Sequence, residues 1–358
     1  MSWIIAFVGF AALVVLHELG HFAAAKAVGM RVEKFSLFFG PMFVKFTRGE
    51  TTYGVGPIPL GGYVKISGMN PAEKIPPEHA HRAYYRQPVW KRIVVIVAGP
   101  VVNIVLAFLI LWLLFWNVGD PVATTQISAP DRGSPAAAVL QENDRLVAVD
   151  GQRGDRRTLA DQIASHRCAV QPPKAGCKAA TPAKLTVVRD GAERTFSITP
   201  VYDAEFKRTR VGFGFKDSRR AIGPVTAAGR SGETMWEVTT ATVGVISRLF
   251  EAEQRKQLSG VVGSYEVTRQ SVNVSAEQTF LILALISLSL GVINLFPFLP
   301  LDGGHIFWAV AEKVRGRPIS FSVMEKASVI GIGLVLILFF IGLQNDITRL
   351  TGPGFDVQ

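Results

Sequence analysis

Four long runs of apolar residues stand out along the chain and predict four helices that cross a membrane. They occupy residues 1–17, 93–116, 280–301 and 327–345. The last three contain the roughly 18–25 apolar residues that a helix needs to span a bilayer core of about 30 Å. The first run reaches this length only if it includes the histidines at its end.

A cleaved signal peptide is the alternative interpretation of the first run, because the small residues of FAAAKA (22–27) resemble a cleavage site. A signal peptide begins with a basic segment, whereas the first Lys or Arg of this chain is Lys26. We therefore expect the first run to remain a membrane helix.

Charged residues in the loops predict how the helices are oriented. Residues 25–92 contain eleven Lys or Arg and four Glu, and the loop after the third run contains Lys313, Arg315 and Arg317. Both loops lie on one side of the membrane, so the positive-inside rule makes that side cytoplasmic and places both termini outside. The net charge of +10 is then explained by topology and anionic membrane lipid. We expect no nucleic-acid partner, since no basic motif is interleaved with aromatic residues.

Between the second and third runs, the pattern changes to short Val-rich stretches that end in Asp-Gly, as in DRLVAVDG (144–151) and AKLTVVRDG (183–191). Such stretches are typical of strands and turns. The sequence GSPAAAVLQENDRLVAVDGQ resembles a PDZ domain of bacterial membrane and periplasmic proteases, with a short helix at 135–140. Val139 and Asn143 stand where relatives usually carry Gly. A PDZ domain binds an extended peptide at a sheet edge, and a packed domain that only screens a neighbouring site is the alternative.

Two further features of this polar segment have open interpretations. Cys168 and Cys177 are compatible with a disulfide in an oxidising compartment, with two free thiols as the alternative. Between 225 and 277, apolar residues at roughly helical spacing predict an amphipathic helix. They are Met235, Val238, Val243, Ile246 and Leu249. This helix could lie on the outer membrane surface and control access, or pack against the PDZ-like domain.

The first run ends in the motif His17-Glu18-Leu19-Gly20-His21. Positions i and i+4 share a helix face, so the two histidines can bind one metal ion, and Glu18 can take a proton from water activated by that metal. An ionisable residue at the centre of a membrane helix costs about 2.5–3.5 kcal/mol on insertion scales, which favours a functional role. The alternative is a helix end whose charges reach the cytoplasmic face.

A third ligand is expected, because catalytic zinc sites use three protein ligands and one open position. The sequence NLFPFLPLDGGH (294–305) supplies two candidates. The third run breaks at its two prolines and ends at Asp302, on the side of the membrane where His21 lies. Unwound backbone at that depth is tolerated only where protein or a wet cavity surrounds it. His305 lies further toward the cytoplasm, so we rank Asp302 first.

Several motifs occur together in a known order: HELGH (17–21), FFGP (38–41), IPLGGYVKISG (58–68), AGPVVN (98–103), the PDZ-like insert and NLFPFLPLDGG (294–304). The chain thereby resembles the site-2 proteases, which are intramembrane zinc metalloproteases. It is most similar to their bacterial regulator-of-sigma type with one PDZ domain. It departs from them at Leu299, where relatives commonly carry Pro.

The resemblance assigns roles to five residues. It implies that one zinc ion is bound by His17, His21 and Asp302. Glu18 would be the catalytic base, and Asn294 would bind the substrate backbone or the developing oxyanion.

The resemblance also implies a re-entrant β-hairpin at 50–68 beside the active site. Its edge could bind substrate in extended form, because a helical substrate hides its scissile carbonyls. A β-ribbon on the cytoplasmic surface is the alternative. For Gly99 and Asn103, close packing of the second helix against its neighbours is expected.

The expected fold is a polytopic α-helical membrane protein with four transmembrane helices, an inserted extracytoplasmic α/β PDZ-like domain and a cytoplasmic-side re-entrant β-hairpin. Its parts are a membrane core at 1–116, the PDZ-like domain at 117–205, a linker with the amphipathic helix at 206–277 and a second membrane core at 278–358.

The resemblance implies a metalloendopeptidase of the bacterial cell membrane that cuts single-span membrane proteins within their spanning segments, such as anti-sigma factors or remnant signal peptides. A membrane adaptor protein without catalytic activity is a second functional class. Such a protein would gain nothing from an ionisable side chain such as Glu18 in the membrane, which argues against this class. A metal transporter is a third class. It would need a continuous polar path, and the runs at 93–116 and 327–345 have almost no polar residues.

Overall fold

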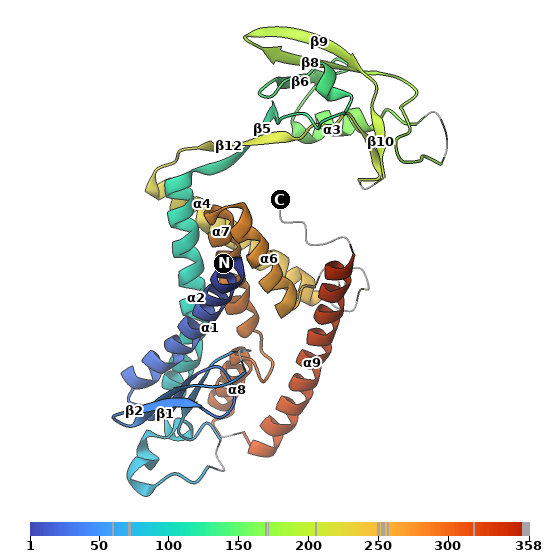
Figure 1. Cartoon of the computed structure of the whole chain (residues 1–358). Coiled ribbons are helices and arrows are strands. Elements are labelled where there is room, and N and C mark those ends of the chain that lie inside the picture. Colours follow the sequence, from blue (N-terminus) through green and yellow to red (C-terminus); the bar gives the residue numbers. More distant parts are fainter. Residues whose placement is uncertain are drawn as a thin grey trace. The chain divides into compact units, whose positions relative to one another are not determined.

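The computed structural model describes residues 1–58, 61–70, 73–168, 170, 172–204, 206–248, 251, 255, 258–317 and 319–352. The chain divides into two compact units. Unit 1 comprises Met1–Asn117 and Gly223–Gln358, and unit 2 comprises Val118–Ile222. Unit 1 is built mainly of helices and unit 2 mainly of strands (Figure 1).

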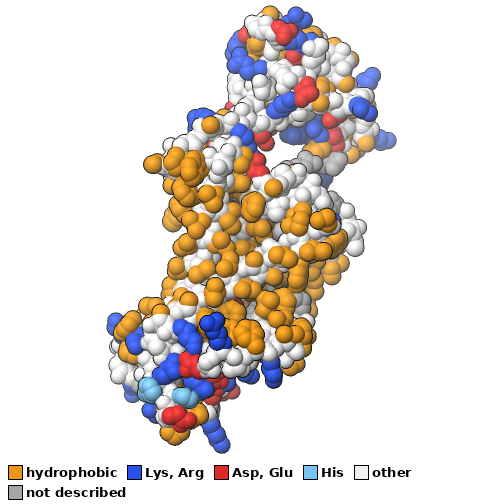
Figure 2. Space-filling view, turned by 60° about the vertical axis from the view of Figure 1, so that its left-hand side comes forward, with side chains coloured by type: hydrophobic (Ala, Val, Ile, Leu, Met, Phe, Trp, Pro, Cys, Tyr) orange, Lys and Arg blue, Asp and Glu red, His pale blue; other side chains and the backbone are white. Residues whose placement is uncertain are grey.

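Among the described residues of unit 1, four helices are long and apolar enough to cross a membrane, as the apolar runs predict. They are α1 (Ser2–Ala27), α2 (Val89–Val118), α7 (Ala276–Asn294) and α9 (Phe321–Thr351). The first run reaches spanning length because α1 continues through both histidines of the HELGH motif. Hydrophobic side chains cover a broad zone over these helices in Figure 2, and charged side chains gather at one end of the unit. An apolar surface of this extent is typical of contact with a membrane.

The third apolar run breaks around its two prolines, as the sequence predicts. α7 ends at Asn294 and residues 295–301 are not helical, but the segment does not end at Asp302 as expected. Proline lacks the N–H that a helix needs and disfavours helical backbone in the residue before it, and this segment holds two prolines. Asp302 instead begins a separate amphipathic helix, α8 (Asp302–Arg315), which is followed by Gly316 in the left-handed conformation.

A small sheet lies at the end of unit 1 where α8 lies (Figure 1). Its strands are β1 (Val32–Leu37), β2 (Val44–Arg48), β3 (Thr51–Val55) and β4 (Tyr63–Ile66), in the order β2-β3-β1-β4. The structure corrects the predicted hairpin at 50–68, because β3 and β4 lie on either side of β1 and do not pair with each other. A tight hairpin needs a short turn, whereas the connection at 56–62 is long and rich in Gly and Pro. Pro59 and Leu60 of this connection lie outside the described residues.

Unit 1 also contains α4 (Pro224–Ser247), α6 (Val261–Val274) and the 3-10 helices η1 (Pro77–Arg82) and η2 (Tyr84–Arg86). The amphipathic helix that the spacing predicts corresponds to α4. Its Met235 and Val238 pack against the buried contact between α2 and α7 around Leu288. This helix therefore packs on the apolar helices of unit 1. Leu249, which the spacing also assigns to this helix, lies outside the described residues.

Unit 2 is organised around an antiparallel sheet with the strand order β12-β5-β6-β8-β9. The short strand β7 pairs with β6 outside this order. The strands are β5 (Asp120–Ile127), β6 (Arg145–Val149), β7 (Gln152–Arg153), β8 (Ala183–Arg189), β9 (Ala192–Ile198) and β12 (Phe215–Arg220). The remaining elements are the pair β10 (Val201–Asp203) and β11 (Arg208–Arg210), the helix α3 (Arg156–Ala164) and the short η3 (Ala136–Ala138). Leu159 and Ile163 of α3 pack into the apolar core beside Leu146 and Leu185 of the sheet.

The Asp-Gly turns of unit 2 form as the sequence predicts. Asp150 and Gly151 join β6 to β7 with φ values of 52° and 83°, and Asp190 and Gly191 join β8 to β9 with 54° and 80°. A positive φ at both central residues is the requirement of a type I′ hairpin turn. Asn143 has a φ of 74°, so Asn adopts here the left-handed conformation that Gly adopts most easily.

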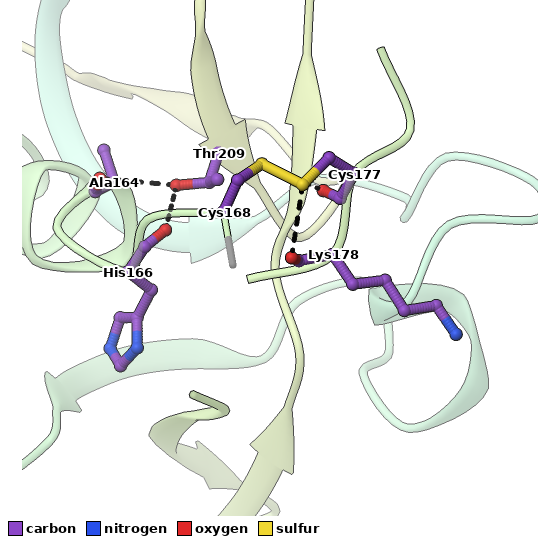
Figure 3. Close-up of a disulfide and its surroundings, with 6 residues drawn as sticks. All are labelled: Ala164, His166, Cys168, Cys177, Lys178 and Thr209. Carbon is purple, nitrogen blue, oxygen red and sulfur yellow. Dashed lines mark hydrogen bonds between the residues drawn. A yellow bond between two sulfur atoms is a disulfide. The ribbon is translucent and has the colours of Figure 1, made fainter. Parts of the chain in front are cut away.

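Cys168 and Cys177 are joined by a disulfide, which decides between the two interpretations that the sequence left open (Figure 3). Their Cα atoms lie 5.9 Å apart. Beside the bridge, Thr209 Oγ1 donates hydrogen bonds to the backbone oxygens of His166, at 2.7 Å, and Ala164, at 3.3 Å. These hydrogen bonds join β11 to the end of α3 and to the residues that lead into the bridged loop.

Candidate metal centre

Two histidines on one face of α1 form the first half of the site. His17 and His21 are one turn apart, and their Nε2 atoms lie 3.3 Å from each other. Both residues are buried, with 7% of each exposed. The spacing of four residues thus brings the two nitrogens together within one helix.

Asp302 forms the second half of the site. Its Oδ2 atom lies 3.2 Å from His17 Nε2 and 3.3 Å from His21 Nε2. The non-helical segment after α7 brings the first residue of α8 to the side of α1. Within the described part of the chain, these three residues are the only group of three or more His, Cys, Asp or Glu that could share a metal ion.

The distances among these three atoms suit a tetrahedral zinc ion. Zinc binds nitrogen and carboxylate oxygen at about 2.0–2.2 Å, and the corners of a tetrahedron of that size are roughly 3.3–3.6 Å apart. The three observed separations are 3.2, 3.3 and 3.3 Å. These three atoms would supply three ligands to a zinc ion, which would leave one coordination position open for water or substrate. The donor set of two imidazoles and one carboxylate is also one that zinc accepts.

Hydrogen bonding supports the same interpretation. His21 Nδ1 donates to the backbone oxygen of Val95 in α2 at 2.9 Å, which leaves Nε2 as the unprotonated nitrogen of a neutral ring. Within the described residues, Asp302 Oδ2 is one of the buried side-chain atoms without a hydrogen-bond partner. It faces both histidine Nε2 atoms, so a cation between the three atoms would satisfy it.

Glu18 and Asn294 line a cavity of about 410 Å³ beside the three ligands. Glu18 follows His17 on α1 and receives a backbone hydrogen bond from Val64 of β4. Asn294 is the last residue of α7, so the end of that helix places its amide at the cavity. His305 also lines the cavity, one turn after Asp302, but does not belong to the group of three ligand atoms.

The edge strand β4 borders this cavity. Tyr63, Val64 and Ile66 line it, and they also line a second cavity of about 470 Å³ that extends to Met69 and Glu73. Since β4 stands at the end of the strand order, one of its edges pairs with β1 and the other is free within the sheet. The backbone of an edge strand can pair with an extended peptide.

Gly99 has a closer relation to the site than the sequence indicates. The sequence predicts that it packs α2 against a neighbouring helix, and its neighbour proves to be the ring of His21. A Cβ at Gly99 would lie 2.2 Å from His21 Nε2, and one at Gly20 would lie 2.5 Å from the backbone oxygen of Ala98. Two glycines therefore let α1 and α2 approach closely where His21 sits. The small residues of the AGPVVN motif are the sequence feature that indicates close packing at this contact.

Comparisons with known proteins agree with this arrangement. The sequence model of peptidase family M50 matches residues 5–338. One relative is a Rhizobium meliloti protein that carries the provisional name of zinc metalloprotease. It is 30% identical over 366 residues, which cover 95% of this chain and 94% of the relative. Protease RseP of Yersinia pestis is 27% identical over 94% of this chain and 96% of its own length. Regulator of sigma-W protease RasP of Bacillus subtilis is 26% identical over 95% and 97%.

Proposed function

This chain belongs to peptidase family M50, and from that premise we propose that it is a zinc-dependent endopeptidase that cuts other membrane proteins within their spanning segments. The observation that carries the proposal is the triangle formed by His17 Nε2, His21 Nε2 and Asp302 Oδ2, with Glu18 beside it in the same cavity. The four long apolar helices in the described part of the chain support a membrane location for this protein.

In this proposal, His17, His21 and Asp302 hold the zinc ion. When bound, zinc acts as a Lewis acid that polarises the scissile carbonyl and makes water nucleophilic at neutral pH. His21 keeps its ring orientation and its tautomer through the hydrogen bond to Val95. The buried position of both histidines limits the contact of their rings with bulk water.

Glu18 is the proposed general base. Its carboxylate accepts the proton of the attacking water and delivers it to the leaving amine, so that both transfers use one side chain. The hydrogen bond from Val64 restrains the carboxylate in the cavity. Asn294 carries an amide N–H₂ that can donate to the developing oxyanion or to the substrate backbone, since it lines the same cavity.

The substrate would reach these groups as an extended strand. A transmembrane helix buries its carbonyls in its own hydrogen bonds, so it must unwind before its peptide bonds can react. The free edge of β4 offers backbone groups to such an unwound segment next to Glu18. Side chains placed along Tyr63–Ile66 would then contact alternate substrate residues.

The biological setting is part of the proposal. The printed name of RasP, regulator of sigma-W protease, connects that relative with a sigma factor. In our proposal this chain cuts single-span membrane proteins such as anti-sigma factors, and remnant signal peptides are a second class of substrate. The protein would span the bacterial cell membrane with both termini and unit 2 outside and the metal site near the cytoplasmic side. Unit 2 would act as a PDZ-like domain that binds a peptide tail or screens substrates by size.

Replacement of Glu18 with Gln in cells that express a tagged single-span substrate tests the proposal. We expect cleavage to be lost while the purified variant retains zinc, because Glu18 is not one of the three ligands. Glu50→Gln is a matched control, since Glu50 pairs with Arg82 and Lys26 in the same unit and does not line the cavity. Undiminished cleavage by the Glu18 variant would overturn the proposed mechanism.

A further inference from the structure

The C-terminal part of α8 is joined to α2 by a bidentate ion pair. Arg92 Nη2 donates to Glu312 Oε1 at 2.6 Å, and Arg92 Nη1 donates to Glu312 Oε2 at 2.9 Å. Arg92 is only 8% exposed, and its guanidinium also lies over the ring of Tyr84, with Cζ 5.9 Å from the ring centroid. Such a shielded bidentate contact fixes orientation as well as distance, which a single contact from a lysine would not.

The same stretch of α2 contacts the other half of the metal site. Val95 lies three residues after Arg92 and accepts the hydrogen bond from His21 Nδ1. Gly99 lies four residues further and faces the His21 ring. Positions spaced by three and four residues share one face of a helix. One face of α2 therefore touches His21 directly and, through Glu312, holds the helix that carries Asp302.

α8 is not a continuation of another helix, so contacts along its length decide where Asp302 lies. The residues before it, 295–301, are not helical, and it ends at Arg315 before Gly316. Glu312 lies about 15 Å along the helix axis from Asp302, at 1.5 Å per residue. A restraint at Glu312 therefore limits the tilt and the axial shift of this short helix, and with them the place of the Asp302 carboxylate.

We infer that the Arg92–Glu312 ion pair is a positioning device for the metal site, through which α2 sets Asp302 against His17 and His21. The inference rests on the proposed function, in which these three residues hold zinc. Arg92 and Glu312 touch neither the ligand atoms nor the cavity and act through α8. If the pair is broken, all three ligands remain, but one of them is displaced.

Zinc affinity of the full chain in detergent micelles, measured by competition with a chromophoric chelator, tests this inference. Glu312→Gln and Arg92→Gln should each weaken zinc binding by about 10–100-fold, which is the usual effect of losing a group that orients a ligand. Because both residues act through one contact, the double variant should bind zinc no more weakly than the single ones.

A second bidentate ion pair in the same unit provides the matched control. Arg82 Nη1 and Nη2 donate to Glu50 at 2.6 and 2.8 Å and join η1 to the turn between β2 and β3. Glu50→Gln removes a pair of equal chemistry, and we expect it to leave zinc affinity unchanged. Equal weakening by Glu50→Gln and Glu312→Gln would overturn the inference, because the effect would then be general destabilisation.

The spectrum of cobalt(II) bound in place of zinc gives an independent measure of ligand geometry. We expect the visible bands of Glu312→Gln to differ from those of the unaltered chain and those of Glu50→Gln to match them. Unchanged affinity and an unchanged spectrum in Glu312→Gln would overturn the inference, while zinc binding and cleavage by the unaltered chain would still support the proposed function. Absence of zinc binding by the unaltered chain would overturn both.

Discussion

His21 Nε2 lies 3.3 Å from Asp302 Oδ2, whereas His305, one turn later on α8, lies outside the group of ligand atoms. Asp302→Ala should therefore weaken zinc binding by more than the roughly 10–100-fold that a residue behind the ligands contributes. His305→Asn should retain the zinc content of the unaltered chain. Metal analysis of both purified variants checks the assignment, and the reverse result would make His305 the third ligand.

Removal of the metal should stop cleavage without unfolding the protein. The site is held by contacts that do not involve metal, among them the His21–Val95 hydrogen bond and the Arg92–Glu312 ion pair. This differs from small zinc domains, whose folding free energy comes from the metal itself. We expect a strong chelator to abolish cleavage of a single-span substrate, added zinc to restore it, and circular dichroism to show the same helix content throughout. A large loss of helix on chelation would contradict this expectation.

The sequence predicts which candidate site residues lie together better than it predicts the scaffold around them, and the roles of these residues stay predictions. His17, Glu18 and His21 follow from spacing within one helix, and Asp302 follows from its expected depth at a broken span. By contrast, β1 gave no clear strand pattern, so its place between β3 and β4 was missed. Strand order depends on backbone pairing between distant segments, and single-sequence patterns report mainly local preference. The contact of Val95 with His21 could not be predicted either. Every residue has a backbone oxygen, and the sequence does not indicate which of them faces His21.

Gly99→Ala should disturb the metal site although Gly99 supplies no ligand. A Cβ at this position would lie 2.2 Å from His21 Nε2, so either the ring or α2 must move. We expect zinc affinity to fall by about tenfold or more, comparable to the loss of an orienting partner. Gly333→Ala in α9 is the control, because a Cβ there meets nothing within 4 Å and Ala favours a helix over Gly. Equal zinc affinity in both variants would show that the packing at Gly99 is not needed by His21.

Stability should depend on pH through Glu50, which lies outside the apolar helices. Hydrogen bonds from Arg82 outweigh partial burial and, together with Lys26, lower the pKa of Glu50 to about 2. A depressed carboxyl pKa stabilises the folded chain above the unfolded pKa of roughly 4.3, and this contribution is lost as pH falls toward about 2. Glu50→Gln should therefore lower stability by about 1–2 kcal/mol near neutral pH, allowing for screening of a part-exposed pair.

Thermal unfolding of the full chain at several pH values checks this pH dependence. The difference in Tm between the unaltered chain and Glu50→Gln should be largest above about pH 5 and should shrink as pH approaches 2. A difference that stays constant over this range would mean that the ion pair does not titrate as its surroundings predict.

The disulfide of unit 2 should stabilise the loop that it closes and leave the metal site unaffected. Joint replacement of Cys168 and Cys177 with Ala removes a short cross-link, which contributes about 2–3 kcal/mol in the chain-entropy account. The loop is also joined to β10, because Tyr202 N–H donates to the Cys177 oxygen at 2.7 Å and Gly176 N–H donates to the Tyr202 oxygen at 3.0 Å. We expect faster amide exchange at these two N–H groups in the variant, with unchanged zinc affinity as the control. Unchanged exchange would mean that these hydrogen bonds hold the loop in place without the disulfide.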